Sequence, residues 1–200
     1  MKSAVFDIET SALEAVGSGV LLCACIRPLA TGRTRTFRMD EYDYAPSDEF
    51  GFFERQEKDL LAAILGELGK YDLLIGQNIE NFDLGFLKSR AARLGVPFTL
   101  APFTYDTMKA WTRTKYRTVL NGFGKPSRSL DMIADFLGIQ QEKTKIYPAE
   151  HWKGVWGNKK QRVEAMDNLV DHCLRDVRMN HKVYEMELPA DNRANIKRWL

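Results

Sequence analysis

The chain has 200 residues, enough for a single domain with a substantial buried core. Its formal net charge of +2 argues against a protein that is basic over its whole surface, and three cysteines fit neither a disulfide framework nor a zinc-binding pattern. The start Met1-Lys2-Ser3 lacks signal-peptide character, and no apolar run approaches the ~18 residues of a membrane span. We therefore expect a soluble, cytoplasmic protein in a reducing environment, with no membrane partner.

Three strands are predicted near the start of the chain. The first contains the apolar run Ala4-Val5-Phe6 and ends at Thr10. Apolar residues predict a second strand over Gly19–Ile26, and alternating polarity predicts a half-exposed third strand over Thr34–Met39. Their short connections indicate an antiparallel meander, and the acidic stretch Asp40–Phe53 that follows is predicted to be a loop.

Helices and strands alternate in the middle of the chain. Apolar residues at helical spacing predict helices over Glu57–Leu68 and Phe82–Leu94, and short apolar runs predict strands over Asp72–Ile75 and Phe98–Tyr105. This order after a meander predicts an α/β fold. We expect a mixed five-stranded sheet, first antiparallel and then parallel, flanked by helices.

A basic segment, 112–128, follows the last predicted strand. Between Thr107 and Leu130 there are six basic residues and no acidic one: Lys109, Arg113, Lys115, Arg117, Lys125 and Arg128. Turn signals predict a mobile loop or hairpin. The segment either grips the phosphate backbone of a nucleic acid or is simply solvated, and the sequence supports both interpretations equally.

Two further helices are predicted in the last third of the chain. One covers Ser129–Leu137, with Ser129 as its N-cap and Gly138 beyond its end. The other is long, covers Gln161–Glu187 and carries a continuous apolar stripe, whereas Ile139–Lys160 is polar and irregular. We therefore expect one domain over residues 1–190 and a C-terminal tail over 191–200.

Acidic residues at separate points of the chain form the pattern with the most chemical meaning. Asp7 and Glu9 are two residues apart on the first strand, so their side chains point to the same face. Such neighbours repel each other at a buried strand end unless a cation lies between them; at an exposed strand end they simply face water. Asp83 opens the second predicted helix, and Asp176 shares a face of the last helix with His172, four residues before it.

Four motifs together resemble the DEDD 3′–5′ exonucleases, close to the proofreading domains of family B DNA polymerases. They are Phe6-Asp7-Ile8-Glu9-Thr10, Asn78 followed by Phe82-Asp83, the segment Ser129–Ile139, and Asp176 in the last helix. Any one motif is weakly specific, whereas four in this order and spacing are strongly specific. The resemblance covers most of the chain and implies a ribonuclease H-like fold.

The resemblance implies that Asp7, Glu9, Asp83 and Asp176 are catalytic and hold two Mg²⁺ or Mn²⁺ ions. The residue types agree, because four hard oxygen ligands without a Cys or His cluster suit Mg²⁺ or Mn²⁺ rather than Zn²⁺. Two ions ~4 Å apart lower the pKa of a water and stabilise a leaving oxygen. The expected reaction is hydrolysis of phosphodiester bonds at the 3′ end of single-stranded DNA, releasing nucleoside 5′-monophosphates.

His172 departs from the family pattern. One branch of the family has Tyr four residues before the last Asp, and the other has His five residues before it; here His172 is at the first spacing and Asp171 at the second. One residue on a helix is a rotation of ~100° and a rise of ~1.5 Å, so we expect His172 where the tyrosine stands. It then orients the attacking water or takes its proton; alternatively it is a partly exposed helix residue.

Four residues near the motifs are candidate substrate contacts: Thr10, Asn78, Phe82 and Tyr105. The rings of Phe82 or Tyr105 can stack on terminal bases, and Asn78 can hydrogen-bond near the scissile end. Core packing is the competing explanation for the aromatic rings. Asp106 and Asp131 are adequately explained as helix-capping residues.

Two other functions remain open. The same fold could act as a nucleic-acid-binding module with weak or no catalysis, which the unusual His172 motivates. It could also be an RNA-directed or endonucleolytic enzyme, because no residue in the sequence is identified as a reader of the 2′-hydroxyl. The sequence identifies no protein partner.

Overall fold

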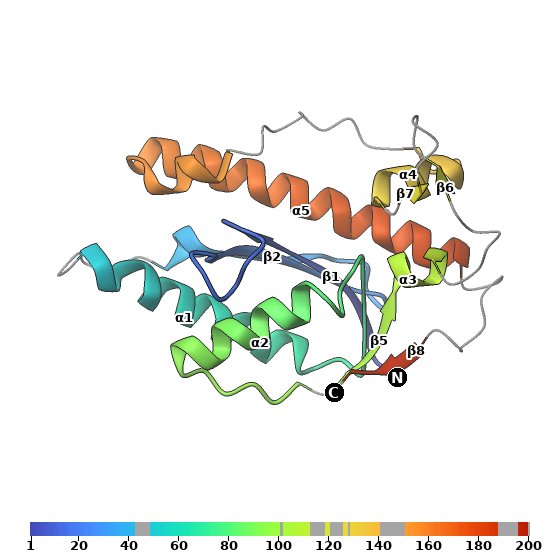
Figure 1. The fold of residues 1–200 in the computed structure, drawn as a ribbon, viewed down its shortest axis with the longest axis horizontal. Coiled ribbons are helices and arrows are strands. Elements are labelled where there is room, and N and C mark those ends of the chain that lie inside the picture. Colours follow the sequence, from blue (N-terminus) through green and yellow to red (C-terminus); the bar gives the residue numbers. More distant parts are fainter. Residues whose placement is uncertain are drawn as a thin grey trace.

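The computed structural model describes residues 1–42, 49–100, 102–112, 119–120, 126–127, 129–140, 151–187 and 196–199. In these residues a six-stranded sheet has helix α5 across one face and helices α1 and α2 across the other (Figure 1). Its strands, in spatial order, are β3 (Arg35–Arg38), β2 (Leu21–Pro28), β1 (Ser3–Thr10), β4 (Leu73–Gly76), β5 (Phe103–Asp106) and β8 (Ile196–Arg198). The α-helices are α1 (Glu49–Leu68), α2 (Asp83–Leu94), α3 (Thr107–Thr112), α4 (Leu130–Phe136) and α5 (Lys159–Glu187).

The strand directions follow the predicted plan. β1, β2 and β3 form an antiparallel meander, and β4 and β5 run parallel to β1. The predicted α/β fold with a mixed sheet is confirmed, but the sheet has one strand more than the five predicted. The additional strand, β8, pairs antiparallel with β5 and lies within the segment predicted to be a tail.

β8 has three residues, too few for an alternating pattern to be recognised in a sequence. Contacts distant in the sequence stabilise it instead. The N–H of Trp199 donates to the carbonyl of Pro102 at 3.0 Å, and the Trp199 ring packs against Phe98 with the Lys88 amine 5.1 Å from the ring centroid. Local sequence pattern alone therefore misses this strand.

The predicted and observed element boundaries differ most at α1. The helix begins at Glu49 rather than Glu57, and a 3₁₀ turn, η1 (Met39–Glu41), lies at the start of the stretch predicted to be a loop. The loop prediction is wrong there because the apolar periodicity begins only at Leu60, whereas acidic residues before it favour a helix N-terminus. At α4 the predicted cap is confirmed, since Ser129 Oγ accepts the N–H of Met132 at 3.4 Å.

The basic segment 112–128 is described in part. Strands β6 (Val119–Leu120) and β7 (Pro126–Ser127) pair antiparallel, as a hairpin requires. Five of its basic residues lie outside the described residues: Arg113, Lys115, Arg117, Lys125 and Arg128. A 3₁₀ segment, η2 (His151–Trp156), precedes α5. Within the ranges given above, no helix combines the length and apolar character needed to span a membrane.

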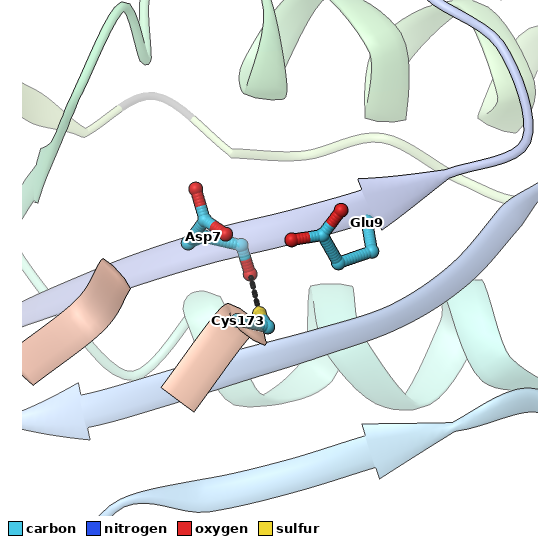
Figure 2. Close-up of side chains that lie close together, drawn as sticks. All are labelled: Asp7, Glu9 and Cys173. Atoms are coloured by element: carbon cyan, nitrogen blue, oxygen red, sulfur yellow. Dashed lines mark hydrogen bonds between the residues drawn. The ribbon is translucent and has the colours of Figure 1, made fainter. Parts of the chain in front are cut away.

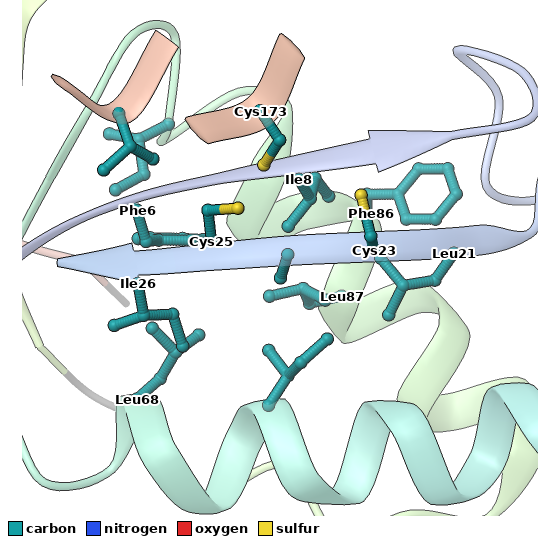
Figure 3. Packing of buried hydrophobic residues seen from close by; sticks show 14 of the residues in the cluster. Phe6, Ile8, Leu21, Cys23, Cys25, Ile26, Leu68, Phe86, Leu87 and Cys173 are labelled. Carbon is teal, nitrogen blue, oxygen red and sulfur yellow. The ribbon is translucent and has the colours of Figure 1, made fainter. Parts of the chain in front are cut away.

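The sheet divides the hydrophobic core into two parts. Figure 3 shows Leu68 of α1 and Leu87 of α2 on one side of β1 and β2, and Cys173 of α5 on the other. Along β1, the buried side chains of Phe6 and Ile8 alternate with acidic side chains. One face of β1 is therefore apolar, and the face beneath α5 carries carboxylates.

Candidate active site

Strand β1 positions the first two acidic residues. Asp7 and Glu9 lie side by side near α5, where the thiol of Cys173 donates a hydrogen bond to the backbone carbonyl of Asp7 at 3.3 Å (Figure 2). β1 pairs with the parallel strand β4 only as far as Val5, opposite Ile75. Both acidic residues therefore lie beyond the last pair of this ladder, next to the turn that follows β4.

That turn positions Asp83. Gly76 is required at its start, because a Cβ there would lie 3.0 Å from the carbonyl oxygen of Phe6, and Asn78 has a left-handed φ of 58°. Helix α2 then begins at Asp83, which is 2% exposed. The nearby backbone N–H groups of Asp83 itself and of Ile8 lower the pKa of the Asp83 carboxyl in part, so the start of α2 lies next to β1.

Helix α5 contributes His172 and Asp176 from one face. The Nε2 atom of His172 lies 3.9 Å from Glu9 Oε1 and 3.8 Å from Asp176 Oδ2. Both distances are too long for hydrogen bonds, so the imidazole stands beside two carboxylates without being bonded to either. Its side chain is 41% exposed, so the imidazole is accessible to a substrate.

Burial and mutual repulsion favour the protonated forms of these carboxyls. Burial raises the pKa of Glu9 to about 8, with added repulsion from Asp176 and Asp83. Burial also raises the pKa of Asp83 to about 7, despite the two backbone N–H groups, and repulsion from Asp106 adds to the rise. The pKa of Asp7 is raised well above its usual value by burial and then by Asp83, Glu9 and Asp176. Burial raises the pKa of Asp176, and the neighbouring His172 and Arg175 partly offset this rise.

We call Asp7, Glu9, Asp83 and Asp176 the acid cluster. Among the described residues, Asp83 Oδ1 and Asp176 Oδ1 are buried without a hydrogen-bond partner, and Arg175 Nη1 is 3.8 Å from the latter. Buried anionic oxygens require a compensating cation or a proton. The donors are hard carboxylate oxygens from three separate elements, so the acid cluster fits Mg²⁺ or Mn²⁺.

Comparison with known proteins identifies the superfamily and supports the fold. A family model described as RNase_H superfamily (RNase_H_2) matches residues 4–187. The chain belongs to the RNase_H superfamily. A search of curated proteins finds no match for this superfamily member.

Among solved structures, the chain is similar to the family B DNA polymerase of the hyperthermophilic archaeon Pyrobaculum calidifontis, with a TM-score of 0.61 and 18% sequence identity. The match covers 94% of this chain and 25% of the polymerase, so the chain spans about a quarter of the length of that enzyme. At this identity the likeness concerns the fold. Superfamily and fold together confirm the resemblance to DEDD exonucleases, and membership of the superfamily supports nuclease activity in general.

The structure of this RNase_H-superfamily chain brings the five residues predicted to be catalytic into one region. The acid cluster converges from β1, α2 and α5, and His172 lies between Glu9 and Asp176. The pair on β1 is not an exposed strand end, because Glu9 has a side chain only 20% exposed. Catalytic and metal-binding roles for these residues stay predictions.

Three of the predicted substrate contacts lie close to the acid cluster in the chain. Asn78 and Phe82 are partly exposed in the turn that leads to Asp83, and the Phe82 ring centroid is 5.8 Å from that of Phe86. The hydroxyl of Thr10 donates to the carbonyl of Ala12 at 2.8 Å and so shapes the loop after β1. Their contact with a substrate stays a prediction.

Tyr105 occupies a different position from the one expected. It is 1% exposed on β5, an interior strand, and its ring makes an edge contact with Tyr184 of α5 at a centroid distance of 4.9 Å. No ring face is accessible for a base. The structure therefore gives no support to a substrate contact by Tyr105 and agrees with the competing explanation of core packing.

Two residues near the site have closer contacts than sequence reasoning indicated. Cys173 belongs to the apolar stripe of α5, yet its Sγ lies within 4.8 Å of carboxylate oxygens of both Asp7 and Glu9. The only sequence signal for this is its spacing of three residues from Asp176 on the same helix. Asp106, assigned to helix capping, is also buried near Asp83.

Proposed function

We propose that this protein is a metal-dependent 3′–5′ exonuclease that removes nucleoside 5′-monophosphates from ends of single-stranded DNA. The observation that carries the proposal is the convergence of four carboxyls from β1, α2 and α5, one buried and three partly buried, beside an accessible imidazole. These carboxyls would hold two Mg²⁺ or Mn²⁺ ions. When bound, such ions supply a lowered pKa for the attacking water and neutralise charge that develops on the phosphodiester.

The carboxyls of the acid cluster must lose their protons before they bind cations. Burial raises the pKa of Glu9 to about 8 and that of Asp83 to about 7, so protons compete with cations near neutral pH. Asp7 and Glu9 come from one rigid strand, whereas Asp83 and Asp176 come from two helices on opposite faces of the sheet. The sheet thus sets the separation of the ligands before any substrate binds.

His172 acts in this proposal as the group that receives the proton of the attacking water. The water oxygen forms a bond to phosphorus, its proton passes to Nε2 of the neutral imidazole, and the bond from phosphorus to the 3′ oxygen breaks. The leaving oxygen takes a proton from solvent. This Nε2 atom lies 3.9 and 3.8 Å from Glu9 and Asp176, so the imidazole stands next to the acid cluster.

Substrate positioning falls to residues around the turn after β4. Phe82 offers a partly exposed ring for stacking on a terminal base, and Asn78 offers an amide near the scissile end. The basic segment 112–128 is the proposed contact for the phosphate backbone. An RNA substrate is the second candidate, because no described residue is assigned to the 2′-hydroxyl.

The test is digestion of a 5′-labelled single-stranded oligonucleotide with Mn²⁺, with Mg²⁺ and with a chelator. We expect a ladder of products shortened from the 3′ end that requires the metal, and no product with Asp7→Asn. The exposed Asp59→Asn is the matched control and should digest normally. A circular single strand should stay intact, since an exonuclease needs an end.

Parallel digestion of RNA of the same sequence separates the two substrate candidates. If the protein shifts the oligonucleotide on a gel but never shortens it with either ion, the binding-module interpretation is correct and the exonuclease proposal fails. Cleavage of the circular strand would instead indicate an endonuclease on the same scaffold.

A further inference from the structure

Asp106 connects two turns at the end of the parallel strands. It is the last residue of β5, in register with Gly76 at the end of β4, and it is 2% exposed. A single oxygen, Oδ1, accepts the N–H of Asn78 at 3.1 Å and the N–H of Lys109 at 3.2 Å. The bond from Lys109, the third residue of α3, is an ordinary N-cap. The bond from Asn78 is not a cap and reaches the turn that precedes Asp83.

We call the segment from Gly76 to Asp83, between β4 and α2, the Asn78 turn. Its conformation requires a restraint of this kind. Asn78 has a φ of 58°, in the left-handed region that residues with a Cβ rarely adopt. The N–H groups of Asn81 and Phe82 donate to the Asn78 carbonyl at 3.1 and 2.9 Å, so the turn closes on this one residue. Asp83 follows immediately, and a displacement of Asn78 therefore displaces Asp83.

A second contact from the same strand end restrains the same turn. The Thr107 hydroxyl, next to Asp106, lies 3.2 Å from the carbonyl oxygen of Gly76. The start of α3 thus contacts the turn at its first residue, and the end of β5 contacts it at its left-handed residue. Asp106 itself repels Asp83, which shows that the two carboxyls are close enough to interact.

We propose that Asp106 is a positioning residue of the acid cluster: its buried Oδ1 holds the Asn78 turn and thereby fixes Asp83 relative to Asp7 and Glu9. This inference rests on the proposed function for its effect on turnover. Its effect on metal affinity is measured separately and does not depend on which nucleic acid is cleaved. If Asp106 only capped α3, its replacement by another capping residue would leave both the metal affinity and the turnover unchanged.

Three substitutions distinguish positioning from capping. Asp106→Ser keeps a good N-cap but has a side chain too short to serve both turns, Asp106→Asn keeps the acceptor oxygen without the charge, and Asp106→Ala removes both functions. The matched control is Asp72→Ala, an exposed acid at the opposite end of β4 whose carboxylate accepts the N–H of Lys2 at 2.7 Å. Each variant is measured for Mn²⁺ affinity by electron paramagnetic resonance of free Mn²⁺, for turnover, and for thermal unfolding.

We expect Asp106→Ser and Asp106→Ala to weaken Mn²⁺ binding and turnover by ~10- to 100-fold, with Asp106→Asn within about 3-fold of wild type and Asp72→Ala unchanged. Wild-type affinity in Asp106→Ser would overturn the proposal in favour of simple capping. An Asp106→Asn variant as weak as Asp106→Ala would also overturn it, because charge rather than the acceptor would then be essential. If Asp106→Ala does not fold, the Ser and Asn variants decide.

The two proposals fail in different ways. A wild-type protein that binds Mn²⁺ but digests no nucleic acid refutes the exonuclease, while the Mn²⁺ affinities of the variants still test Asp106. A wild-type protein that binds no Mn²⁺ refutes the positioning role, because there is then no metal site to position.

Discussion

Carboxylates on the two faces of the sheet differ in whether a positively charged side chain neutralises them. On the face covered by α1 and α2, Glu57 of α1 is 1% exposed and is paired with Arg90 of α2, whose side chain is 4% exposed. Arg90 Nε donates to Glu57 Oε1 at 2.7 Å, Nη2 donates to Oε2, and the N–H of Leu21 adds a bond at 2.9 Å. Toward α5, the acid cluster has no comparable bidentate guanidinium among the described residues.

The difference shows that this fold can neutralise a buried acid with its own cation, whereas among the described residues the acid cluster has only the long contact of Arg175 with Asp176 at 3.8 Å. Glu57 has its two oxygens bonded to donors, whereas Glu9 and Asp83 have pKa values raised to about 8 and about 7. Buried negative charge without an internal partner is stable only if protons or external cations bind it. The contrast between the two faces is therefore the physical basis for a metal site on one of them.

The largest effect should come from breaking the internal ion pair. Arg90→Met leaves Glu57 buried without its cation, which should lower the free energy of unfolding by about 3–5 kcal/mol in a urea titration. Arg93→Met is the matched control one turn further along α2, because Arg93 and Glu54 form an exposed pair; it should change stability by less than ~1 kcal/mol. Equal losses in the two variants would contradict the contrast drawn above.

His172→Ala tests whether the imidazole beside the acid cluster acts on the attacking water. If His172 acts on the substrate water, its removal should lower turnover by about 100-fold while Mn²⁺ affinity stays near wild type. His181→Ala is the control on the same helix, since His181 Nδ1 accepts a bond from Arg27 at 2.9 Å, outside the acid cluster. Weakened turnover in both variants, or unchanged turnover in His172→Ala, would remove His172 from the mechanism.

Sequence reasoning predicted the acid cluster better than it predicted the elements around it. Asp7 and Glu9 could be placed because alternation on a strand fixes their shared face, and His172 and Asp176 because a helix fixes the face of residues four apart. Asp83 could be assigned because its motif places it at a helix start. Each of these inferences relies on the regular geometry of a strand or a helix.

The features that sequence reasoning missed depend on contacts between distant segments. β8 pairs with β5 across more than ninety residues of sequence, for example Ile196 with Tyr105. The bond from Asn78 to Asp106 joins the ends of two neighbouring strands, and capping explained Asp106 without it. For Tyr105 the sequence allowed both stacking on a base and packing in the core, and the contact of its ring with Tyr184 of α5 favours packing. Such contacts leave no repeating pattern in the neighbouring sequence, so they could not be predicted from it.

The metal-free protein should lose stability as pH rises. Because burial raises the folded-state pKa of Asp83 to about 7 and of Glu9 to about 8, above their unfolded values near 4, the folded state binds more protons than the unfolded state in between. Their contribution is fully present below the unfolded pKa values near 4 and is lost progressively as pH rises to 7 for Asp83 and to 8 for Glu9. We expect a fall of about 2 kcal/mol between pH 6 and pH 9 in chelator, measured by urea unfolding.

Saturating Mn²⁺ should remove most of this fall, because a cation that binds only the folded state stabilises it by mass action. Stability that is flat from pH 6 to pH 9 without metal would mean that the acid cluster is compensated internally.

The smallest expected effect is a gain in stability from removing one of the repelling charges. Asp83→Asn resembles the protonated carboxyl at every pH, so it should stabilise the metal-free protein by at least about 1 kcal/mol at pH 9 and by almost nothing at pH 3, where wild-type Asp83 is protonated in both the folded and the unfolded state. The same variant should lose the stabilisation by Mn²⁺, whereas the exposed Asp59→Asn should change neither quantity. A variant that is more stable and yet binds metal less well is expected only where buried charge is kept for a ligand; if Asp83→Asn instead destabilises the metal-free protein at pH 9, Asp83 is a structural acid like Glu57 and the two faces of the sheet do not differ.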